Sequence, residues 1–153
     1  MIRNVMHMVV PVALLAVGVA ADAQKFAVRC AGTDFMEDTT EGTVVNTKYA
    51  LDGQVYVIDE EARRVLRAVD ARKQLADLCD VTKPSCEMTV AQDYLEAHGA
   101  AQRDGYTANV SFEYNKASGA ALHKINMDYD DGRYVHIRWQ MNCQQAPIPT
   151  FGE

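Results

Sequence analysis

Apolar and polar residues alternate with a period of two along much of this chain. In the segments 26–31, 106–114 and 134–143, every second residue is apolar or aromatic, and most residues between them are small or polar. A period of two directs one set of side chains to a buried face of a strand and the other set to solvent. We therefore predict β-strands in all three segments, each with one face in the core.

Turn-forming residues separate the strands of the C-terminal third. The segments 115–119, Asn-Lys-Ala-Ser-Gly, and 130–132, Asp-Asp-Gly, both place Asn or Asp early and Gly late. Hairpin connections favour this order because their last residue adopts a positive φ. The sequence predicts a three-stranded antiparallel meander with strands at 106–114, 120–129 and 133–143.

The central part of the chain predicts further strands. Thr43–Leu51 and Gln54–Asp59 have the composition of strands on either side of Asp52-Gly53, which we interpret as a turn. Met88–Leu95 is another candidate strand, which ends before His98-Gly99.

The segment 60–79 admits two interpretations. Four apolar residues have the spacing of a helix, whereas Tyr56–Asp59, the polar residues after it and Val65-Leu66 follow the order strand, turn, strand. We favour a hairpin over 54–69, with a short helical or irregular segment at about 72–79. The predicted fold class is all-β: an antiparallel meander sheet or small barrel with one short helical segment, cross-linked by disulfides.

The first 23 residues have the layout of a secretory signal peptide. Arg3 precedes the apolar run 5–20, and Ala21-Asp22-Ala23 forms a small-x-small cleavage pattern before Gln24. The run is shorter than the roughly 20 residues that span a membrane, and a lipoprotein would need Cys where Gln24 stands. We predict a signal peptide at 1–23, a single β-rich domain at 24–143, an extended tail at 144–153 and a periplasmic or secreted location without a membrane span.

All four cysteines lie in the predicted mature part of the chain. An even number of cysteines in an exported protein indicates disulfides, and four cysteines allow three pairings. We favour Cys79–Cys86, which closes a short turn-like loop, and Cys30–Cys143, which joins the first and last strands. Cys30 and Cys143 both fall on the apolar sets of their strands, as a cross-link between core faces requires. The absence of C-x-x-C spacing and of His–Cys clustering argues against a metal site or redox pair.

The net charge of the chain limits the classes of partner that the protein is expected to bind. The 153 residues carry a formal net charge of −6, with 15 Lys and Arg against 21 Asp and Glu. An acidic protein without a basic cluster is a poor candidate for binding nucleic acid, because such binding depends on neutralising phosphates.

Two segments combine a strand with turn residues: Val55–Val65, Val-Tyr-Val-Ile-Asp-Glu-Glu-Ala-Arg-Arg-Val, and Phe112–Ala120, Phe-Glu-Tyr-Asn-Lys-Ala-Ser-Gly-Ala. Both resemble segments of short exported proteins of unknown function from Gram-negative bacteria. The resemblance covers about the central and C-terminal two thirds of the chain and rests on turn chemistry. It implies a small all-β fold and brings no active site with it.

No motif predicts a metal, a cofactor or a catalytic centre. In the acidic segment 128–132, Gly132 stands at the fifth position, whereas an EF-hand loop needs glycine at the sixth. His123 and His136 lie on neighbouring predicted strands but on opposite faces. No serine stands in G-x-S-x-G, and no glycine-rich phosphate loop is present.

Aromatic residues gather in the C-terminal meander and allow two interpretations. Tyr106, Tyr114, Tyr134 and Trp139 could pack across strands within a half-buried sheet. Alternatively, they could form an aromatic face that binds an extended peptide or a glycan.

These observations favour a non-catalytic exported domain of unknown function that binds an envelope component, another protein or a small ligand. One alternative is an inhibitor of an extracellular hydrolase that presents the loop Asp80–Ser85. Another is a small secreted hydrolase with a carboxylate or histidine site that is assembled only in space.

Overall fold

The computed structural model describes residues 24–40, 43–69, 73–80, 82 and 86–151, and it contains nine β-strands and no helix within these ranges. The predicted signal peptide at 1–23 lies outside them. The strands are β1 (Lys25–Thr40), β2 (Thr43–Asp59), β3 (Arg64–Val69), β4 (Gln74–Asp77), β5 (Cys86–Val90), β6 (Tyr94–Arg103), β7 (Tyr106–Asn115), β8 (Ala120–Tyr129) and β9 (Tyr134–Ala146).

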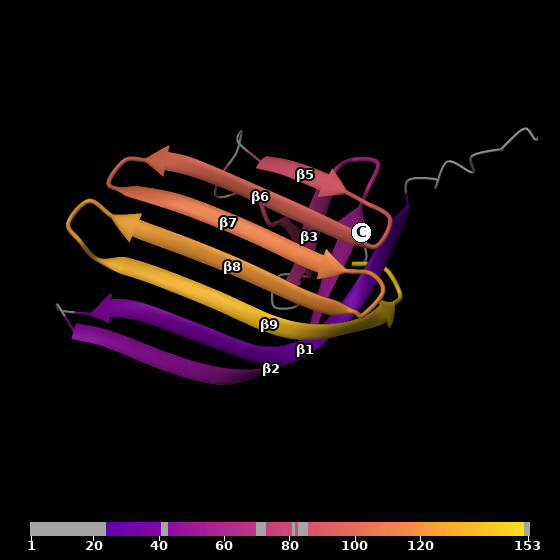
Figure 1. Cartoon of the computed structure of the whole chain (residues 1–153), viewed down its shortest axis with the longest axis horizontal. Coiled ribbons are helices and arrows are strands. Elements are labelled where there is room, and N and C mark those ends of the chain that lie inside the picture. Colours follow the sequence, from indigo (N-terminus) through magenta and orange to yellow (C-terminus); the bar gives the residue numbers. More distant parts are fainter. Residues whose placement is uncertain (1–23, 41–42, 70–72, 81, 83–85, 152–153) are drawn as a thin grey trace, which may run out of the picture.

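All nine strands belong to one antiparallel sheet in the order β4-β3-β2-β1-β9-β8-β7-β6-β5 (Figure 1). The prediction of an all-β fold is confirmed, and so is the meander formed by β7, β8 and β9. β9 continues to Ala146, so residues 144–146 of the predicted tail pair with β1 in the sheet.

The predicted short helical segment at 72–79 is wrong for the described residues of that range. Gln74–Asp77 forms β4, in which Leu75 pairs with Ala68 and Asp77 with Leu66 of β3. Gln74–Asp77 pairs with β3, and this pairing outweighs the helix-forming composition of the segment. As a strand, the segment extends the sheet beside the apolar residues of β3. The predicted hairpin over 54–69 is confirmed by β2 and β3.

One predicted turn and one predicted strand differ from the structure. Asp52-Gly53 does not reverse the chain but forms a β-bulge within β2, opposite Ala31, with Gly53 at a φ of 74°. A bulge uses the same Asp-Gly chemistry as a hairpin turn and bends the strand instead of ending it. The predicted strand Met88–Leu95 is likewise interrupted, because β5 ends at Val90 and β6 begins at Tyr94.

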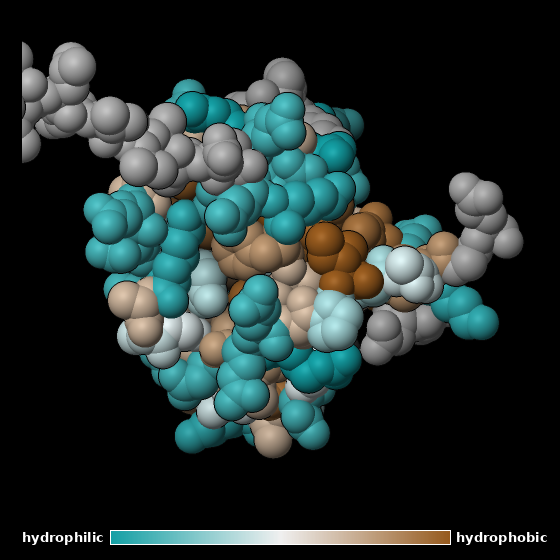
Figure 2. Space-filling model, turned by 90° about the vertical axis from the view of Figure 1, so that its right-hand side faces the viewer, coloured by the Kyte–Doolittle hydropathy of each residue, from teal (hydrophilic) through white to brown (hydrophobic). Residues whose placement is uncertain are grey.

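The sheet rolls so that one of its faces encloses the main core. β2 and β7 are four strands apart, about 19 Å in a flat sheet, yet the rings of Tyr56 and Phe112 lie 4.9 Å apart between centroids. Buried side chains from eight strands, all but β4, meet on this inner face. A smaller buried cluster, Ala27, Val55, Val57, Leu66 and Ala68, covers the outer face of β1–β3 and contacts Phe151. Figure 2 shows the end of the molecule where β5, β7 and β9 end, and on this side hydrophilic residues surround a smaller hydrophobic area.

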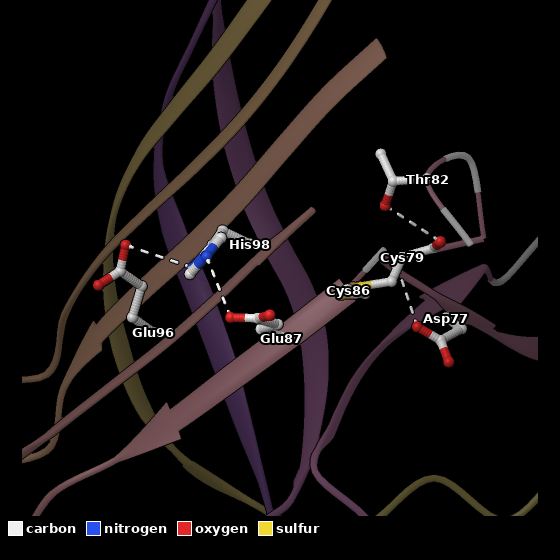
Figure 3. Close-up of a disulfide and its surroundings, with 7 residues drawn as sticks. All are labelled: Asp77, Cys79, Thr82, Cys86, Glu87, Glu96 and His98. Atoms are coloured by element: carbon white, nitrogen blue, oxygen red, sulfur yellow. Dashed lines mark hydrogen bonds and ion pairs between the residues drawn. A yellow bond between two sulfur atoms is a disulfide. The ribbon is translucent and has the colours of Figure 1, made fainter. Parts of the chain in front are cut away.

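Both predicted disulfides are present. Cys30 and Cys143 are register partners on the adjacent strands β1 and β9, with Cα atoms 4.0 Å apart. Cys79 follows β4 and Cys86 begins β5, so the second disulfide links the two opposite edge strands of the sheet (Figure 3). Asp77 Oδ1 accepts a hydrogen bond of 2.9 Å from the backbone N–H of Cys79 and orders this link.

Polar contacts also join strands at the rolled end of the sheet. The ammonium of Lys116, after β7, lies 2.5 Å from the carboxylate of Glu60, after β2. The Arg63 guanidinium donates a 3.1 Å hydrogen bond to the backbone oxygen of Met88 in β5. These contacts join the two halves of the sheet at the end where its edges meet.

We expect the two disulfides to contribute unequally to stability. Cys30 and Cys143 are 113 residues apart and Cys79 and Cys86 only 7. On the chain-entropy model, C30A/C143A lowers the free energy of unfolding by about 5 kcal/mol and C79A/C86A by about 2–3 kcal/mol. Urea denaturation of the two double variants measures both losses. A larger loss for C79A/C86A would show that the link between the sheet edges matters more than loop closure.

Candidate functional site

A buried polar cluster lies at the centre of the rolled sheet. His123 in β8 has no solvent exposure, and its Nδ1 lies 3.2 Å from the hydroxyl of Tyr56 in β2. Its ring stacks on Trp139, its register partner in β9, at 4.4 Å between centroids. Within the described residues, neither His123 Nε2 nor Asp34 Oδ1 has a hydrogen-bond partner.

The environment of this cluster keeps His123 neutral. Burial and, as the smaller cause, the positive charge of Arg67 together lower the pKa of His123 to about 3. Burial also raises the pKa of the Tyr56 phenol, so its hydroxyl stays protonated near neutral pH. Because the His123 side chain has no solvent-exposed surface, it cannot contact a substrate in this structure. The cluster therefore does not support the hypothesis of a secreted hydrolase.

The other two histidines of the described residues lie on the outer face of the sheet. His136 Nε2 lies 2.8 Å from Asp128 Oδ1, and His98 lies 3.9 Å from both Glu87 and Glu96 (Figure 3). The prediction that His123 and His136 point to opposite faces is confirmed. Across the part of the chain that the structure describes, no three His, Cys, Asp or Glu side chains form a group that could hold a metal ion.

The four aromatic residues of the predicted binding face do not come together on one exposed surface. Tyr114 and Trp139 are buried in the core, each with 7% of its surface exposed. Tyr106 lies on the same inner face and packs on Tyr129 at 5.6 Å between ring centroids. Tyr134 lies on the outer face, against His136.

Three cations and one aromatic ring form a row across four neighbouring strands on the outer face. Register pairs Lys48 of β2 with Phe35 of β1, Phe35 with Arg138 of β9, and Arg138 with Lys124 of β8. The Lys48 ammonium lies 5.1 Å and the Arg138 guanidinium 4.9 Å from the centre of the Phe35 ring. We call these four residues the cationic row.

The charges of the cationic row are only partly compensated. The Lys124 ammonium lies 3.8 Å from Glu113 Oε1. Lys48 and Arg138 have no ion-pair partner within the described residues. Like charges directly opposite each other in a sheet are destabilising, so the pair of Lys124 and Arg138 stabilises neither strand. An anion bound between them would relieve their repulsion.

A hollow of about 470 Å³ lies over the cationic row. Its polar lining includes Asn46, Asn126, His136 and Glu37 beside the three cations. A second hollow of about 450 Å³ shares Lys124 and Asn126 with it and continues over β7 and β6 to Ser111 and His98. The outer face thus offers cations together with amide and hydroxyl groups along a shallow groove.

The sequence contained one signal for this site. Lys124 and Arg138 are equally distant from Asp131 in the predicted 130–132 turn, which places them opposite each other on the polar face of the hairpin. Lys48 joins them only because β1 pairs with both β2 and β9, and the local sequence pattern does not predict these pairings.

No protein-family model matches the chain, and no curated protein shows significant similarity to it. Among the described residues, the structure contains no helix with the length and apolar character needed to cross a membrane.

We expect His123 to make the protein less stable in acid. Its pKa is lower in the folded state than the ordinary value of 6.5, so the unfolded chain binds more protons between about pH 6.5 and about pH 3. The free energy of unfolding is therefore not reduced by His123 above pH 6.5, and it falls as the pH drops through that interval. H123Q should flatten this dependence in urea denaturation measured at several pH values.

The matched control is H98Q, which removes a half-exposed histidine from the outer face. We expect H98Q to keep the pH dependence that His123 contributes, because this substitution leaves the buried cluster intact. An unchanged slope for H123Q would show that folding does not lower the pKa of His123.

Proposed function

We propose that this protein is a non-catalytic exported domain that binds an anionic component of the cell envelope in the hollow over the cationic row. The observation that carries the proposal is the direct pairing of Lys124 with Arg138, with Lys48 beyond Phe35, in a chain of net charge −6. The repulsion between Lys124 and Arg138 does not stabilise the sheet, and a bound anion would relieve it.

The contacts of Phe35 support a preformed site. Both neighbouring cations pack on its ring, which restricts their side chains before any ligand arrives. Restricting side chains in advance lowers the entropy lost on binding. Arg138 can bind a carboxylate, sulfate or phosphate through two parallel hydrogen bonds.

The remaining lining indicates a ligand with hydroxyl groups as well as charge. The Asn46 and Asn126 side chains each carry both hydrogen-bond donors and acceptors. Hydroxyl groups need partners of both kinds, whereas a bare anion needs only donors. The ligand class that fits best is an acidic oligosaccharide.

The disulfides support a location outside the cytoplasm. Cross-linked cysteine pairs are typical of proteins in oxidising compartments outside the cytoplasm. Together with the predicted signal peptide, they favour the periplasm or the exterior of the cell. The inhibitor hypothesis stays a prediction, because residues 81 and 83–85 of its loop lie outside the described residues.

We expect R138Q to weaken binding of a uronic-acid oligosaccharide by roughly tenfold or more, since hydrogen bonds to charged groups contribute about 1.5–3 kcal/mol. K48Q should weaken binding less, because lysine makes no bidentate contact. Calorimetric titration at low and high salt measures both effects, and added salt should weaken binding by the wild type.

The matched control is R133Q, which removes one positive charge at the exposed β8–β9 turn, where Arg133 pairs with Asp131. It should bind as the wild type does. A neutral oligosaccharide of the same length should bind more weakly than the acidic one. Equal binding of the acidic and neutral sugars, or equal losses for R138Q and R133Q, would refute the proposed site.

A further inference from the structure

β2 has a long free edge. On one side it pairs with β1 along its whole length. Asp59 pairs with Lys25 at one end, and Thr43 pairs with Thr40 at the other. On the other side β3 covers it only from Tyr56 to Asp59. Along 43–53, no strand of the described residues pairs with this edge, and Figure 1 shows β2 as the outermost strand there.

Exposed apolar side chains gather on the same stretch. Of the five large hydrophobic residues that are exposed in the described part of the chain, three lie here: Val44 at 51%, Val45 at 38% and Tyr49 at 58%. Proteins usually protect an open edge with charged side chains, bulges or a covering loop. Lys48 is the only charged residue of 43–51, and its ammonium lies over Phe35 on the outer face. This edge is therefore available for pairing with another strand.

The free edge of β2 includes one regular segment with a defined middle residue. It extends from Thr43, the first residue of β2, to Leu51, the last residue before the bulge at Asp52-Gly53. An antiparallel pair formed by this whole segment from two copies has its twofold axis at the middle residue, Thr47. In that register, residue 45 faces residue 49 of the second copy, and residue 46 faces residue 48.

The side chains match in this register. Val45 faces Tyr49 of the second copy, an aromatic and β-branched pair of the kind that stabilises antiparallel sheets. It occurs twice, and Lys48 faces the neutral Asn46. Centring the pair on Lys48 would instead place two ammonium groups opposite each other, which is unfavourable.

We propose that two copies of this protein associate through the free edges of β2, antiparallel and centred on Thr47. The association continues the sheet from one copy into the other and covers Val45 and Tyr49. It does not depend on the anion-binding proposal, because it rests on backbone hydrogen bonds and apolar contacts.

The oxidised wild-type protein should show a reversible monomer–dimer equilibrium in sedimentation and in size-exclusion chromatography with light scattering. V45E and Y49K should each weaken the dimer by about tenfold, since each removes two cross-strand pairs. The double variant V45E/Y49K should recover dimerisation, because each introduced carboxylate then faces an introduced ammonium of the second copy.

The control is V90K, which places a charge on the other edge strand, β5, where Val90 is 36% exposed. It should dimerise as the wild type does. A monomer at every concentration, or single variants that dimerise normally, would overturn the proposal. A double variant no better than the single ones would also overturn it, because recovery depends on the stated register.

Hydrogen exchange of the wild type tests the proposal without substitutions. Amides of 43–51 should gain protection as the protein concentration rises, whereas amides of β5 should not. Protection that is independent of concentration at 43–51 would contradict a second copy as the occupant. Acidic oligosaccharide titrated into V45E should still bind, which separates failure of the dimer from failure of the proposed function.

Discussion

The structure depends on a single sheet that buries its apolar face against itself. Without helices among the described residues, the inner face of β2 and β3 can be covered only by β5–β7 from the other half of the same sheet. The contact of Tyr56 with Phe112 is the direct evidence of this rolling. The link between Cys79 and Cys86 then joins the edge strands that rolling brings together.

Rolling divides the molecule into two parts of different character. The burial pattern of β2 changes at the bulge, from mainly exposed residues at 43–50 to continuous burial at 55–59. Before the bulge, the β1–β2 ribbon extends beyond the rolled core and has one free edge. Buried contacts thus concentrate at the rolled end, whereas the ribbon and the adjoining outer face supply the surfaces that we assign to binding.

The sequence predicted the features that local chemistry determines. Alternation and turn residues located β7, β8 and β9, and the apolar positions of Cys30 and Cys143 located one disulfide. Asp52-Gly53 was misinterpreted because a bulge and a turn demand the same backbone conformation, and only the pairing with β1 distinguishes them. The cationic row combines strands that are distant in sequence, and the register of three strand pairs assembles it.

Lys48 connects the two proposed surfaces. Its ammonium belongs to the cationic row, while its backbone belongs to the free edge of β2. In the dimer that we propose, Lys48 faces Asn46 of the second copy, and both residues line a hollow in their own copy. The two hollows would then meet across the twofold axis on one continuous outer face. An acidic oligosaccharide long enough to enter both would bind bivalently, and its apparent affinity would exceed that of a single hollow.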